Sequence, residues 1–522
     1  EFRGIPMMAP DILTVQTATS VMGNYTFKLT FEQYSVILVW MAFFFTFLRL
    51  HEVKVTEKRV FHIAGFIVVA LGCGLFTNQI ILSDFMEEHQ INIRMFRPME
   101  SYQKYGGVLT FARSVGYAVV KKPEGYTTAK VDQIIQEYEK KSANEQQSTA
   151  KQYPNIITVV NETFADIKVL GDFKTNEDYM PYFHSLKKNC VTGYTYASIV
   201  GGQTANTEFE LLTGNTLGFL SAGTTAFQLY IHGQMPSLVS NLKAEGYSGN
   251  KAMHPFNPYN YNRPAVYKDF GFTDFIDKFD FPKNVKRVRE YISDEANVDR
   301  IISEYEKNRK KTDQPFYMYN MTIQNHSPYD KDAANFKQPI KIESSKYDAE
   351  ANRYLNLIKY SDDSLKQLTS YFEKCKEPTI ILFLGDHQPR LTDEFMNKIT
   401  NGQYQTWSSE QMMKRYQVPF VIWANYDIKG QHIEKTSMNY IQSILTQTAG
   451  VKMTGYQRFL NEVRKEVPTI TSQGYWGKNG KFYQINDKGS PYYGIIQKYR
   501  MIQYNMMFDK KNRRDSFFEV SK

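Results

Sequence analysis

The chain has 522 residues, a formal net charge of +9 and 42% hydrophobic residues, enough apolar sequence for a large buried core and more than one structural unit. The basic excess is modest and no nucleic-acid-binding motif occurs, so we expect no nucleic-acid partner; the charge suits anionic partners such as lipid headgroups or phosphates. The three cysteines, Cys73, Cys190 and Cys375, form no C-x-x-C pair, which argues against a cysteine zinc site. Whether Cys190 and Cys375 meet in space stays open at this point.

Two apolar runs near the start predict two transmembrane helices, at about 34–50 and 61–82. The second has the roughly 20 residues that a bilayer crossing needs, and snorkelling of Arg49 extends the first. The alternative is a buried helical hairpin, which fits less well because the runs carry almost no charge. The loop between them, residues 51–59, is basic, so the positive-inside rule places it in the cytoplasm and everything after Leu82 outside the cell.

The chain starts without an initiator Met and without a signal peptide, so we expect it to begin inside a longer membrane protein. Its composition predicts three regions. Residues 1–90 are the C-terminal part of a membrane domain, 91–152 a juxtamembrane helical linker, and 153–522 an extracellular catalytic domain. The linker is predicted from the polar run KVDQIIQEYEKKSANEQQSTAKQ, which fades into Ser, Gln and Lys.

The pattern changes after Tyr153. The runs PNIITVVNE, PFYMYNMTIQN and PTIILFLGDH are apolar and bounded by Pro and polar residues, which is typical of buried parallel strands. Helical stretches lie between them, such as Met235–Gly246 and Ala351–Lys374. Alternating strands and helices predict an α/β fold with helices on both faces of a sheet.

Polar side chains follow each of these strands. The predicted strands and the residues after them are Ile156–Val160 with Glu162, Met318–Ile323 with His326, and Ile380–Leu384 with Asp386 and His387. Ligands of open α/β sheets bind beyond the carboxyl ends of the strands, so we expect these side chains to converge. Two carboxylates and an imidazole are a suitable ligand set for Mn²⁺ or Zn²⁺. Taken singly, "GDH" could be a strand-end turn and Glu162 a helix cap.

The stretch GGQTANTEFELLTG, Gly201–Gly214, combines small residues, hydroxyls and the start of an amphipathic helix. A threonine hydroxyl becomes a nucleophile when a metal or a base lowers its pKa, and Thr204 could also be a fourth metal ligand. The helix start would aim N–H groups at a phosphate. The alternative is that Thr204 only caps the helix. However, Thr207 and Glu210 have the spacing of a capping box, which would leave Thr204 available for chemistry.

The motifs GGQTANTEFELLTG, QNHSPY and LGDHQPR resemble those of the lipoteichoic acid synthase family of phosphoglycerol transferases, a branch of the alkaline phosphatase and sulfatase superfamily. FRGIPMMAPDILT and RMIQYNMMFD extend the resemblance over most of the chain. The resemblance implies an alkaline-phosphatase/sulfatase-like sheet flanked by helices, preceded by a helical transmembrane domain. It also implies one Mn²⁺ ion, with Mg²⁺ or Zn²⁺ less expected.

The resemblance implies a role for each candidate residue. The metal ligands would be Glu162, Thr204, Asp386 and His387, the catalytic residues Thr204 and His326, and the substrate-binding residues His254, Tyr261, Arg263 and His326. The stretch HPFNPYNYNR corresponds to the family's headgroup-binding segment, where the synthases have Trp in place of Tyr261. Alternatively, His254 is a turn residue and Arg263 lies on the surface.

These motifs predict a membrane-anchored, multi-pass phosphoglycerol transferase with its catalytic domain outside the cell. Thr204 would take glycerol phosphate from phosphatidylglycerol and pass it to a polyglycerol phosphate chain, a glycolipid or a glycan. Three alternatives remain. A sulfatase would need a C/S-x-P-x-R motif, which is absent around Thr204. A metal-dependent phosphodiesterase would use water as the acceptor, and an inactive lipid-binding envelope assembly protein would not need all four ligands.

Overall fold

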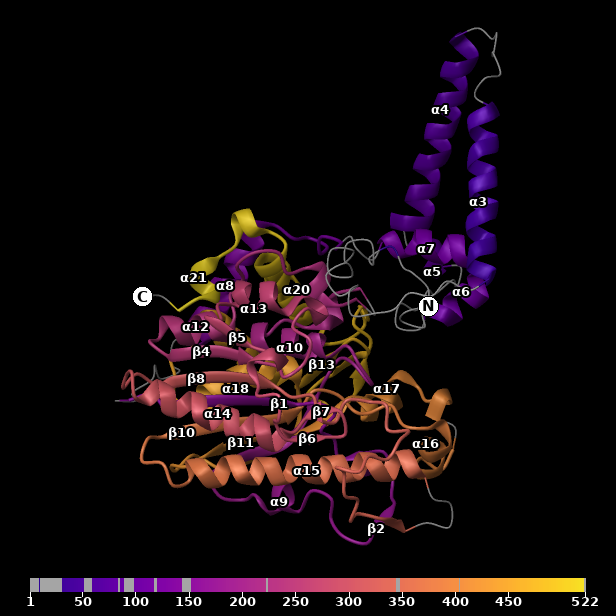
Figure 1. Cartoon of the computed structure of the whole chain (residues 1–522). Coiled ribbons are helices and arrows are strands. Elements are labelled where there is room, and N and C mark those ends of the chain that lie inside the picture. Colours follow the sequence, from indigo (N-terminus) through magenta and orange to yellow (C-terminus); the bar gives the residue numbers. More distant parts are fainter. Residues whose placement is uncertain are drawn as a thin grey trace. The chain divides into compact units, whose positions relative to one another are not determined.

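A computed structural model describes residues 9, 31–50, 59–82, 85–88, 98–116, 120–142, 152–221, 224–343, 348–402 and 404–520. The chain divides into two compact units, Glu1–Val119 and Val120–Lys522. The first unit carries the apolar runs, and the second carries every candidate site residue. Figure 1 shows both units.

The described part of the first unit is helical. Its helices are α3 (Phe31–Leu50), α4 (Arg59–Phe76), the π-helix η2 (Thr77–Leu82) that follows α4 directly, α5 (Phe85–Glu88), α6 (Pro98–Tyr105) and α7 (Gly107–Gly116). One stretch among the described residues, Ile63–Ile81, is long and apolar enough to cross a membrane, with a mean hydropathy of 1.8 and none of it buried. Arg113 of α7 donates hydrogen bonds to the carbonyls of Ile80 and Ile81, which satisfies acceptors at the end of this helix.

The predicted pair of transmembrane helices stays a prediction, for which the described residues provide one helix of sufficient length and apolarity. The second run forms the candidate span, whereas the apolar stretch of α3, Ile37–Thr46, is shorter than a bilayer crossing needs. Exposed aromatic side chains such as Trp40 and Phe66 occur on both helices. Residues 51–58 of the basic loop lie outside the described residues. A multi-pass domain and its orientation therefore stay predictions.

The second unit is built on an eight-stranded mixed sheet. Its strands, in spatial order, are β12 (Gln431–Ser437), β3 (Cys190–Tyr196), β11 (Gln417–Ala424), β10 (Thr379–Gly385), β1 (Asn155–Asn161), β8 (Phe316–Met321), β4 (Ser248–Met253) and β5 (Asp274–Ile276). The strands from β10 to β5 are parallel to one another, whereas β11 runs antiparallel to both of its neighbours. Smaller pairings join β13 (Thr469–Thr471), β14 (Gly474–Trp476) and β15 (Phe482–Tyr483), as well as β2 (Lys174–Thr175) with β9 (Ile342–Glu343) and β6 (Arg287–Val288) with β7 (Tyr291–Ile292).

The three strands predicted from apolar runs are confirmed and lie side by side as β10, β1 and β8. The register pairs Val160 of β1 with Leu384 of β10 and with Met321 of β8, so the three carboxyl ends are level. β8 ends at Met321, two residues earlier than predicted. The level ends bring the residues that follow the strands to one edge of the sheet.

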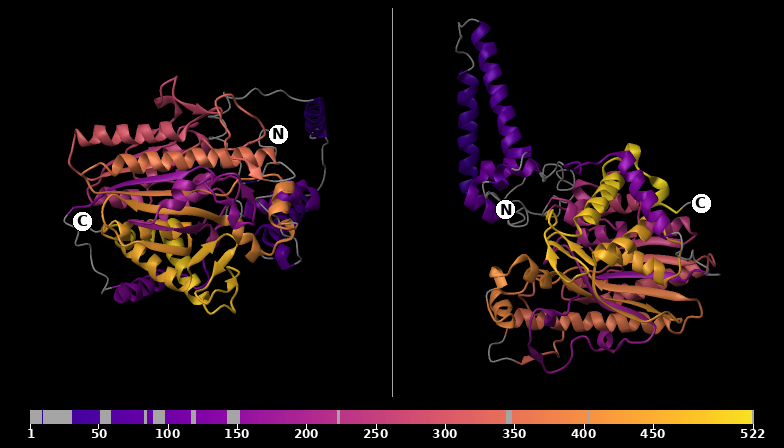
Figure 2. Two further views of the ribbon diagram at one scale, coloured as in Figure 1. Left: turned by 90° about the horizontal axis from the view of Figure 1, so that it is seen from below. Right: turned by 180° about the vertical axis from the view of Figure 1, so that it is seen from behind.

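Helices cover both faces of the sheet (Figures 1 and 2). The helices of this unit are α8 (Thr128–Ser142), α9 (Pro181–Ser185), α10 (Thr204–Thr213), α11 (Ala226–Leu229), α12 (Leu238–Ala244), α13 (Arg263–Phe270), α14 (Asp294–Arg309), α15 (Ala349–Phe372), α16 (Asp393–Ile399), α17 (Ser409–Met412), α18 (Met438–Thr448), α19 (Gly455–Glu466), α20 (Tyr493–Met507) and α21 (Asp515–Phe518). In the left view of Figure 2, α14 and α15 lie on one side of the sheet and the C-terminal helices on the other. Consistently, Ile157 and Val159 of β1 join the core under α14 and α15, while Ile156 and Val160 join the opposite core.

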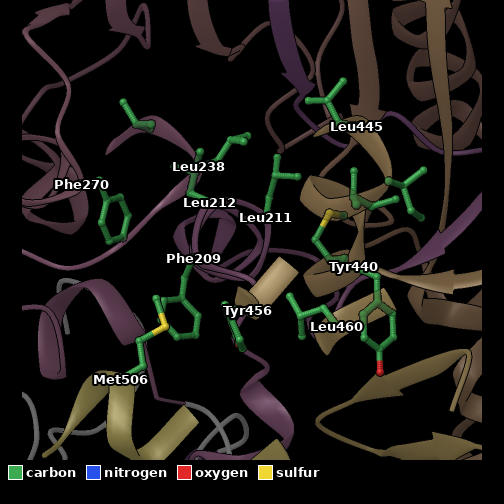
Figure 3. Close-up of a cluster of buried hydrophobic side chains, with 14 of the residues drawn as sticks. Phe209, Leu211, Leu212, Leu238, Phe270, Tyr440, Leu445, Tyr456, Leu460 and Met506 are labelled. Atoms are coloured by element: carbon green, nitrogen blue, oxygen red, sulfur yellow. The ribbon is translucent and has the colours of Figure 1, made fainter. Parts of the chain in front are cut away.

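The helix α10 lies at the centre of the core on the face of the sheet opposite α14 and α15. Figure 3 shows Phe209, Leu211 and Leu212 of α10 packed among side chains of α12, α13, α18, α19 and α20. All ten residues of α10 are buried. The helix that carries the candidate nucleophile is thus held from every side by close packing.

Residues 120–142, which the sequence places in the linker, contribute to this unit. Val131, Ile134 and Tyr138 of α8 belong to the same core as α10, and Lys498 of α20 forms an ion pair with Glu137 at 2.7 Å. The compact unit therefore begins well before the predicted boundary at residue 153, while the membrane domain and the remaining linker stay predictions.

The cysteines are unpaired. Cys190 is buried in β3, Cys375 follows α15 and Cys73 lies in α4, and each is a free thiol. The question that the sequence left open is thereby answered: Cys190 and Cys375 do not form a disulfide.

Candidate active site and metal centre

Three of the candidate ligands follow the ends of β1 and β10. Glu162 follows β1, and Asp386 and His387 follow β10. β10 ends in Gly385 because its backbone passes against the Phe164 carbonyl: a Cβ at residue 385 would lie 1.8 Å from that oxygen. This close approach holds the Asp386–His387 turn against the loop after β1.

Glu162, Asp386 and His387 form a buried triad, in which one ligand atom from each lies within 4.8 Å of the others. His387 Nε2 lies 3.2 Å from Asp386 Oδ2 and 3.8 Å from Glu162 Oε1. The backbone carbonyl of Gln388 lies 2.9 Å from His387 Nδ1. Because a carbonyl can only accept, the neutral ring carries its proton on Nδ1, and Nε2 directs a lone pair at the two carboxylates.

That arrangement fits a bound cation. Among the described residues, neither Asp386 Oδ2 nor His387 Nε2 has a hydrogen-bond partner, although both are buried. Asp386 Oδ1, in contrast, accepts from the N–H groups of Thr163 and His387 at 2.7 and 2.8 Å, which fixes the direction of Oδ2. Lone pairs that face each other in a buried site repel, so the donor set fits a divalent metal ion bound by oxygen and nitrogen.

The pKa of Glu162 points the same way. Burial and the neighbouring Asp386 carboxylate raise it well above its ordinary value, while the charge of Arg263 and a hydrogen bond from the Thr204 side chain oppose them in part. The carboxylate oxygens of Glu162 thus lie in contact with the hydroxyl that the sequence singles out as a nucleophile.

Thr204 is the first residue of α10, and it is buried. Gly201, Gly202 and Gln203 before it all have positive φ values, 67°, 145° and 63°. This left-handed turn brings the chain out of the loop and into the helix within three residues. The N-cap is therefore Gln203, which makes no side-chain cap bond, and the alternative that Thr204 is only an N-cap does not hold.

The predicted capping box of Thr207 and Glu210 is wrong. Thr207 lies inside α10, and its hydroxyl donates to the Asp386 carbonyl at 2.7 Å. Glu210 instead accepts from the Ser198 hydroxyl at 2.6 Å and from the Leu217 N–H at 2.9 Å. Both side chains bond to residues outside α10, so the capping-box spacing does not form a cap. The bond from Thr207 ties the nucleophile helix to the metal-ligand turn.

His254 and His326 lie near the triad, each with one ring nitrogen bound to a backbone carbonyl. His254 Nδ1 lies 3.0 Å from the Met321 carbonyl, and His326 Nδ1 lies 2.7 Å from the Ser327 carbonyl. Each neutral ring therefore keeps Nε2 as an acceptor. Burial lowers the pKa of both, and the charge of Arg263 adds to this at His254.

Arg263 begins α13 and is fully buried. Its Nε and Nη2 atoms donate to Glu208 Oε1 at 3.0 and 2.7 Å, and Tyr261 covers the guanidinium at 5.1 Å from ring centroid to Cζ. One edge of the guanidinium is thus occupied by Glu208, through Nε and Nη2. Tyr261 and Asn262 both adopt left-handed φ values, 60° and 58°, an uncommon pair of conformations that sharply turns the chain into α13.

Comparison with known proteins identifies the superfamily. Residues 154–451 match the family described as Sulfatase, a range that covers more than half of the chain and contains all the candidate site residues. The chain belongs to the sulfatase family.

Relatives refine this placement. A putative cyclic β-1,2-glucan modification protein of Rhizobium meliloti is 30% identical over 433 residues, which cover 81% of this chain and 65% of that protein. Lipoteichoic acid synthase of Staphylococcus saprophyticus is 23% identical over 374 residues, covering 69% of this chain and 55% of that protein. The resemblance to the lipoteichoic acid synthase family is confirmed by relatives of that name, although the chain spans less than two thirds of the length of either.

Solved structures show the same fold. The Streptococcus pyogenes phosphoglycerol transferase GacH, in complex with sn-glycerol-1-phosphate, aligns with a TM-score of 0.62 at 20% identity over 77% of this chain and 100% of that chain. The lipoteichoic acid synthase LtaP from Listeria monocytogenes aligns with a TM-score of 0.53 at 20% identity over 74% of this chain and 98% of that chain. This sulfatase-family chain thus has an alkaline-phosphatase-like α/β fold with a mixed sheet between helices.

The most consequential residue of this sulfatase-family site that the sequence analysis did not single out is Glu208. It follows Thr204 by four residues, so both lie on one face of α10, and this helical spacing was the available signal. Besides Arg263, Glu208 accepts from the hydroxyls of Tyr267 and Tyr319, the latter at 3.1 Å. No sequence pattern indicated that Glu208 pairs with Arg263, which lies 55 positions away.

Two further groups support the site. Asn325 Nδ2 donates to the Glu162 carbonyl at 3.0 Å and to the Ser361 hydroxyl at 2.8 Å, which holds the backbone of the metal-ligand residue. The guanidinium of Arg289 donates to the carbonyls of Gln324, His326 and Pro328 at 2.7–2.8 Å. Arg289 thereby fixes the loop that carries His326. No motif in the sequence indicated Arg289.

Proposed function

We propose that the chain is a membrane-anchored phosphoglycerol transferase that moves glycerol phosphate from phosphatidylglycerol, through a covalent intermediate on Thr204, to a cell-envelope acceptor. One observation carries the proposal. The Thr204 hydroxyl, at the N-terminus of a tightly packed helix, contacts a buried triad whose unpartnered ligand atoms face one another. The names of relatives, lipoteichoic acid synthase and putative cyclic β-1,2-glucan modification protein, support a transferase of the cell envelope.

Glu162, Asp386, His387 and Thr204 would hold one divalent ion, for which we propose Mn²⁺. When bound, such an ion supplies positive charge that lowers the pKa of a hydroxyl and offsets charge on a phosphoryl oxygen. The first half-reaction forms a bond between Thr204 Oγ1 and phosphorus and breaks the bond to the diacylglycerol oxygen, which takes up a proton. The second forms a bond from an acceptor oxygen to phosphorus and breaks the bond between Thr204 Oγ1 and phosphorus, and Thr204 takes up the proton that the acceptor hydroxyl loses.

The neighbouring residues suit the donor headgroup. Arg263 Nη1 can donate to a phosphate oxygen, because Glu208 occupies only the opposite edge of the guanidinium. His254 Nε2 can accept from a glycerol hydroxyl, and Tyr261 can cover the carbon skeleton. His326 Nε2 can accept the proton of an incoming hydroxyl and, once protonated, give it to the leaving oxygen.

The test uses the full chain in detergent with Mn²⁺ and phosphatidylglycerol labelled in its headgroup. We expect release of diacylglycerol and, with an acceptor present, transfer of labelled glycerol phosphate to it, both absent from Thr204→Ala. Release of free glycerol phosphate at the same rate with every acceptor would make the chain a phosphodiesterase. Absence of diacylglycerol with this lipid would reject the proposed donor.

A further inference from the structure

The second unit exposes large hydrophobic side chains at the edge of the candidate site. Among its described residues, two such side chains are exposed, Tyr259 at 47% and Phe279 at 73%. Both belong to the turns that follow β4 and β5, beside the candidate headgroup residues. Scattered single exposures are ordinary, but confinement of both to the edge of the candidate site is not explained by packing.

Phe279 is held outward by its own turn. It lies in the short 3₁₀ helix η6 (Lys278–Asp280), where Asp277 Oδ1 accepts from the Phe279 N–H at 2.7 Å and Asp280 Oδ2 accepts from the Asp277 N–H at 2.9 Å. This reciprocal cap fixes the backbone, so the exposed ring of Phe279 belongs to an ordered turn.

Phe256 connects this turn to the site. Its ring stacks on His326, with centroids 6.3 Å apart and planes 20° apart, and its carbonyl accepts from the Lys278 N–H at 3.4 Å. Lys278 Nζ lies 5.9 Å from the Phe256 centroid and 4.9 Å from the Phe279 centroid. The Phe256 ring therefore adjoins His326, and Lys278 lies between Phe256 and the exposed ring of Phe279. We name Phe256, Tyr259 and Phe279 the aromatic rim.

The polar groups around the aromatic rim are close to neutral in sum. Lys278 is accompanied by Asp277 and Asp280, which disfavours a polyanion such as a chain of glycerol phosphates. The side chains of Asn260 and Asn262, between Tyr259 and Arg263, are half-buried and make no side-chain hydrogen bonds among the described residues. Such amides pair well with hydroxyl groups.

We propose that the aromatic rim is the acceptor subsite and that it binds a neutral sugar ring of a glycan. One face of a pyranose carries C–H groups with partial positive charge, which pack against the negative face of an aromatic ring, while its hydroxyls pair with amides and carboxylates at the edge. The inference rests on the proposed function, which leaves the acceptor open. It names that acceptor as a glycan rather than polyglycerol phosphate.

The test measures binding without the lipid donor. The full chain in detergent is titrated by calorimetry with neutral gluco-, galacto- and manno-hexaoses and with a polyglycerol phosphate oligomer. We expect one or more hexaoses to bind, with Phe279→Trp within about threefold of the parent and Phe279→Leu weaker by on the order of tenfold. Leu keeps the apolar character but lacks the ring face. Phe482→Leu, on β15 outside the aromatic rim, should bind like the parent.

Each contrary result overturns the inference. If no hexaose binds, the aromatic rim is not a sugar subsite. If Phe279→Leu binds the hexaose as the parent does, the exposed surface acts by apolarity alone, as a lipid or protein contact would. If the polyglycerol phosphate oligomer binds more tightly and loses affinity in Phe279→Leu, the acceptor is anionic. The proposed function has its own assay, because its failure would appear as an absence of diacylglycerol release from phosphatidylglycerol.

Discussion

Glu208 and Arg263 form a completely buried ion pair in which one carboxylate oxygen accepts two guanidinium protons, at 3.0 and 2.7 Å. Glu208 lies one helical turn after Thr204, so the pair links the nucleophile helix to the start of α13. Burial opposes the charge on Arg263, but Glu208 outweighs it and raises the pKa of the guanidinium above its ordinary value. Arg263 therefore has a structural partner as well as a proposed substrate.

The pair changes the outcome expected for Arg263 variants. A purely substrate-binding role, as the sequence predicts for Arg263, would make Arg263→Ala affect activity alone. Because this variant also leaves Glu208 unpaired in the core, we expect it to destabilise the fold by about 3–5 kcal/mol. The double variant Glu208→Gln/Arg263→Gln should recover much of that stability, because no buried charge remains, but should not recover turnover of phosphatidylglycerol. Thermal unfolding and diacylglycerol release, measured on the same samples, separate the two effects. Recovery of both would make the pair purely structural.

Removal of a triad ligand should remove the metal. Asp386→Ala and His387→Ala should each bind no divalent ion after dialysis, while the parent retains one equivalent by elemental analysis. His254→Gln is the matched control, since this histidine is equally buried but lies outside the triad, and it should keep the ion. Metal at 100 times its Kd should stabilise the parent by about 2.7 kcal/mol and His387→Ala not at all. Full metal in His387→Ala would contradict the ligand assignment.

Glu210 should make stability fall as the pH rises. Burial raises its pKa from 4.5 to about 7, although hydrogen bonds from Ser198, Leu217 and Thr216 oppose the shift. Between these values Glu210 holds a proton in the folded state and has lost it in the unfolded state. The contribution of Glu210 to the free energy of unfolding is therefore fully present below about pH 4.5 and lost by about pH 7. The loss is on the order of 3 kcal/mol.

Glu210→Gln isolates this effect, because other groups titrate in the same way in both proteins. The variant should gain stability relative to the parent as the pH is raised from 5 to 8, measured by thermal unfolding in detergent. An equal pH dependence in parent and variant would show that Glu210 keeps an ordinary pKa in the folded chain.

The sequence predicts the strands and the metal-ligand residues of the site better than it predicts the residues that hold them in place. The strands β1, β8 and β10 are apolar runs of strand length bounded by Pro, and parallel strands place their carboxyl ends together, so the meeting of Glu162, Asp386 and His387 followed from local pattern and a general rule. The helix start at Thr204 was foreseen, but the capping box at Thr207 was not formed, because the Asp386 carbonyl offered a partner that no sequence spacing reveals.

The supports depend on contacts between distant segments. Glu208 pairs with Arg263 across 55 positions, and Arg289 binds carbonyls of the His326 loop from 35 to 39 positions away. Likewise, α8 reads as a polar linker because its charged residues outnumber the apolar ones, yet Val131, Ile134 and Tyr138 are enough to bury one face. Such pairings are set by the tertiary fold and carry no local signal.

The nucleophile is the central claim, and its covalent intermediate tests it most directly. The full chain with Mn²⁺ and phosphatidylglycerol, quenched in acid without an acceptor, should yield a glycerophosphate adduct on the Thr204 peptide, located by fragment-ion mass spectrometry. Thr204→Ala should fold like the parent and carry no adduct, because one hydroxyl contributes little to stability. An adduct on Thr207, or full turnover by Thr204→Ala, would contradict the account.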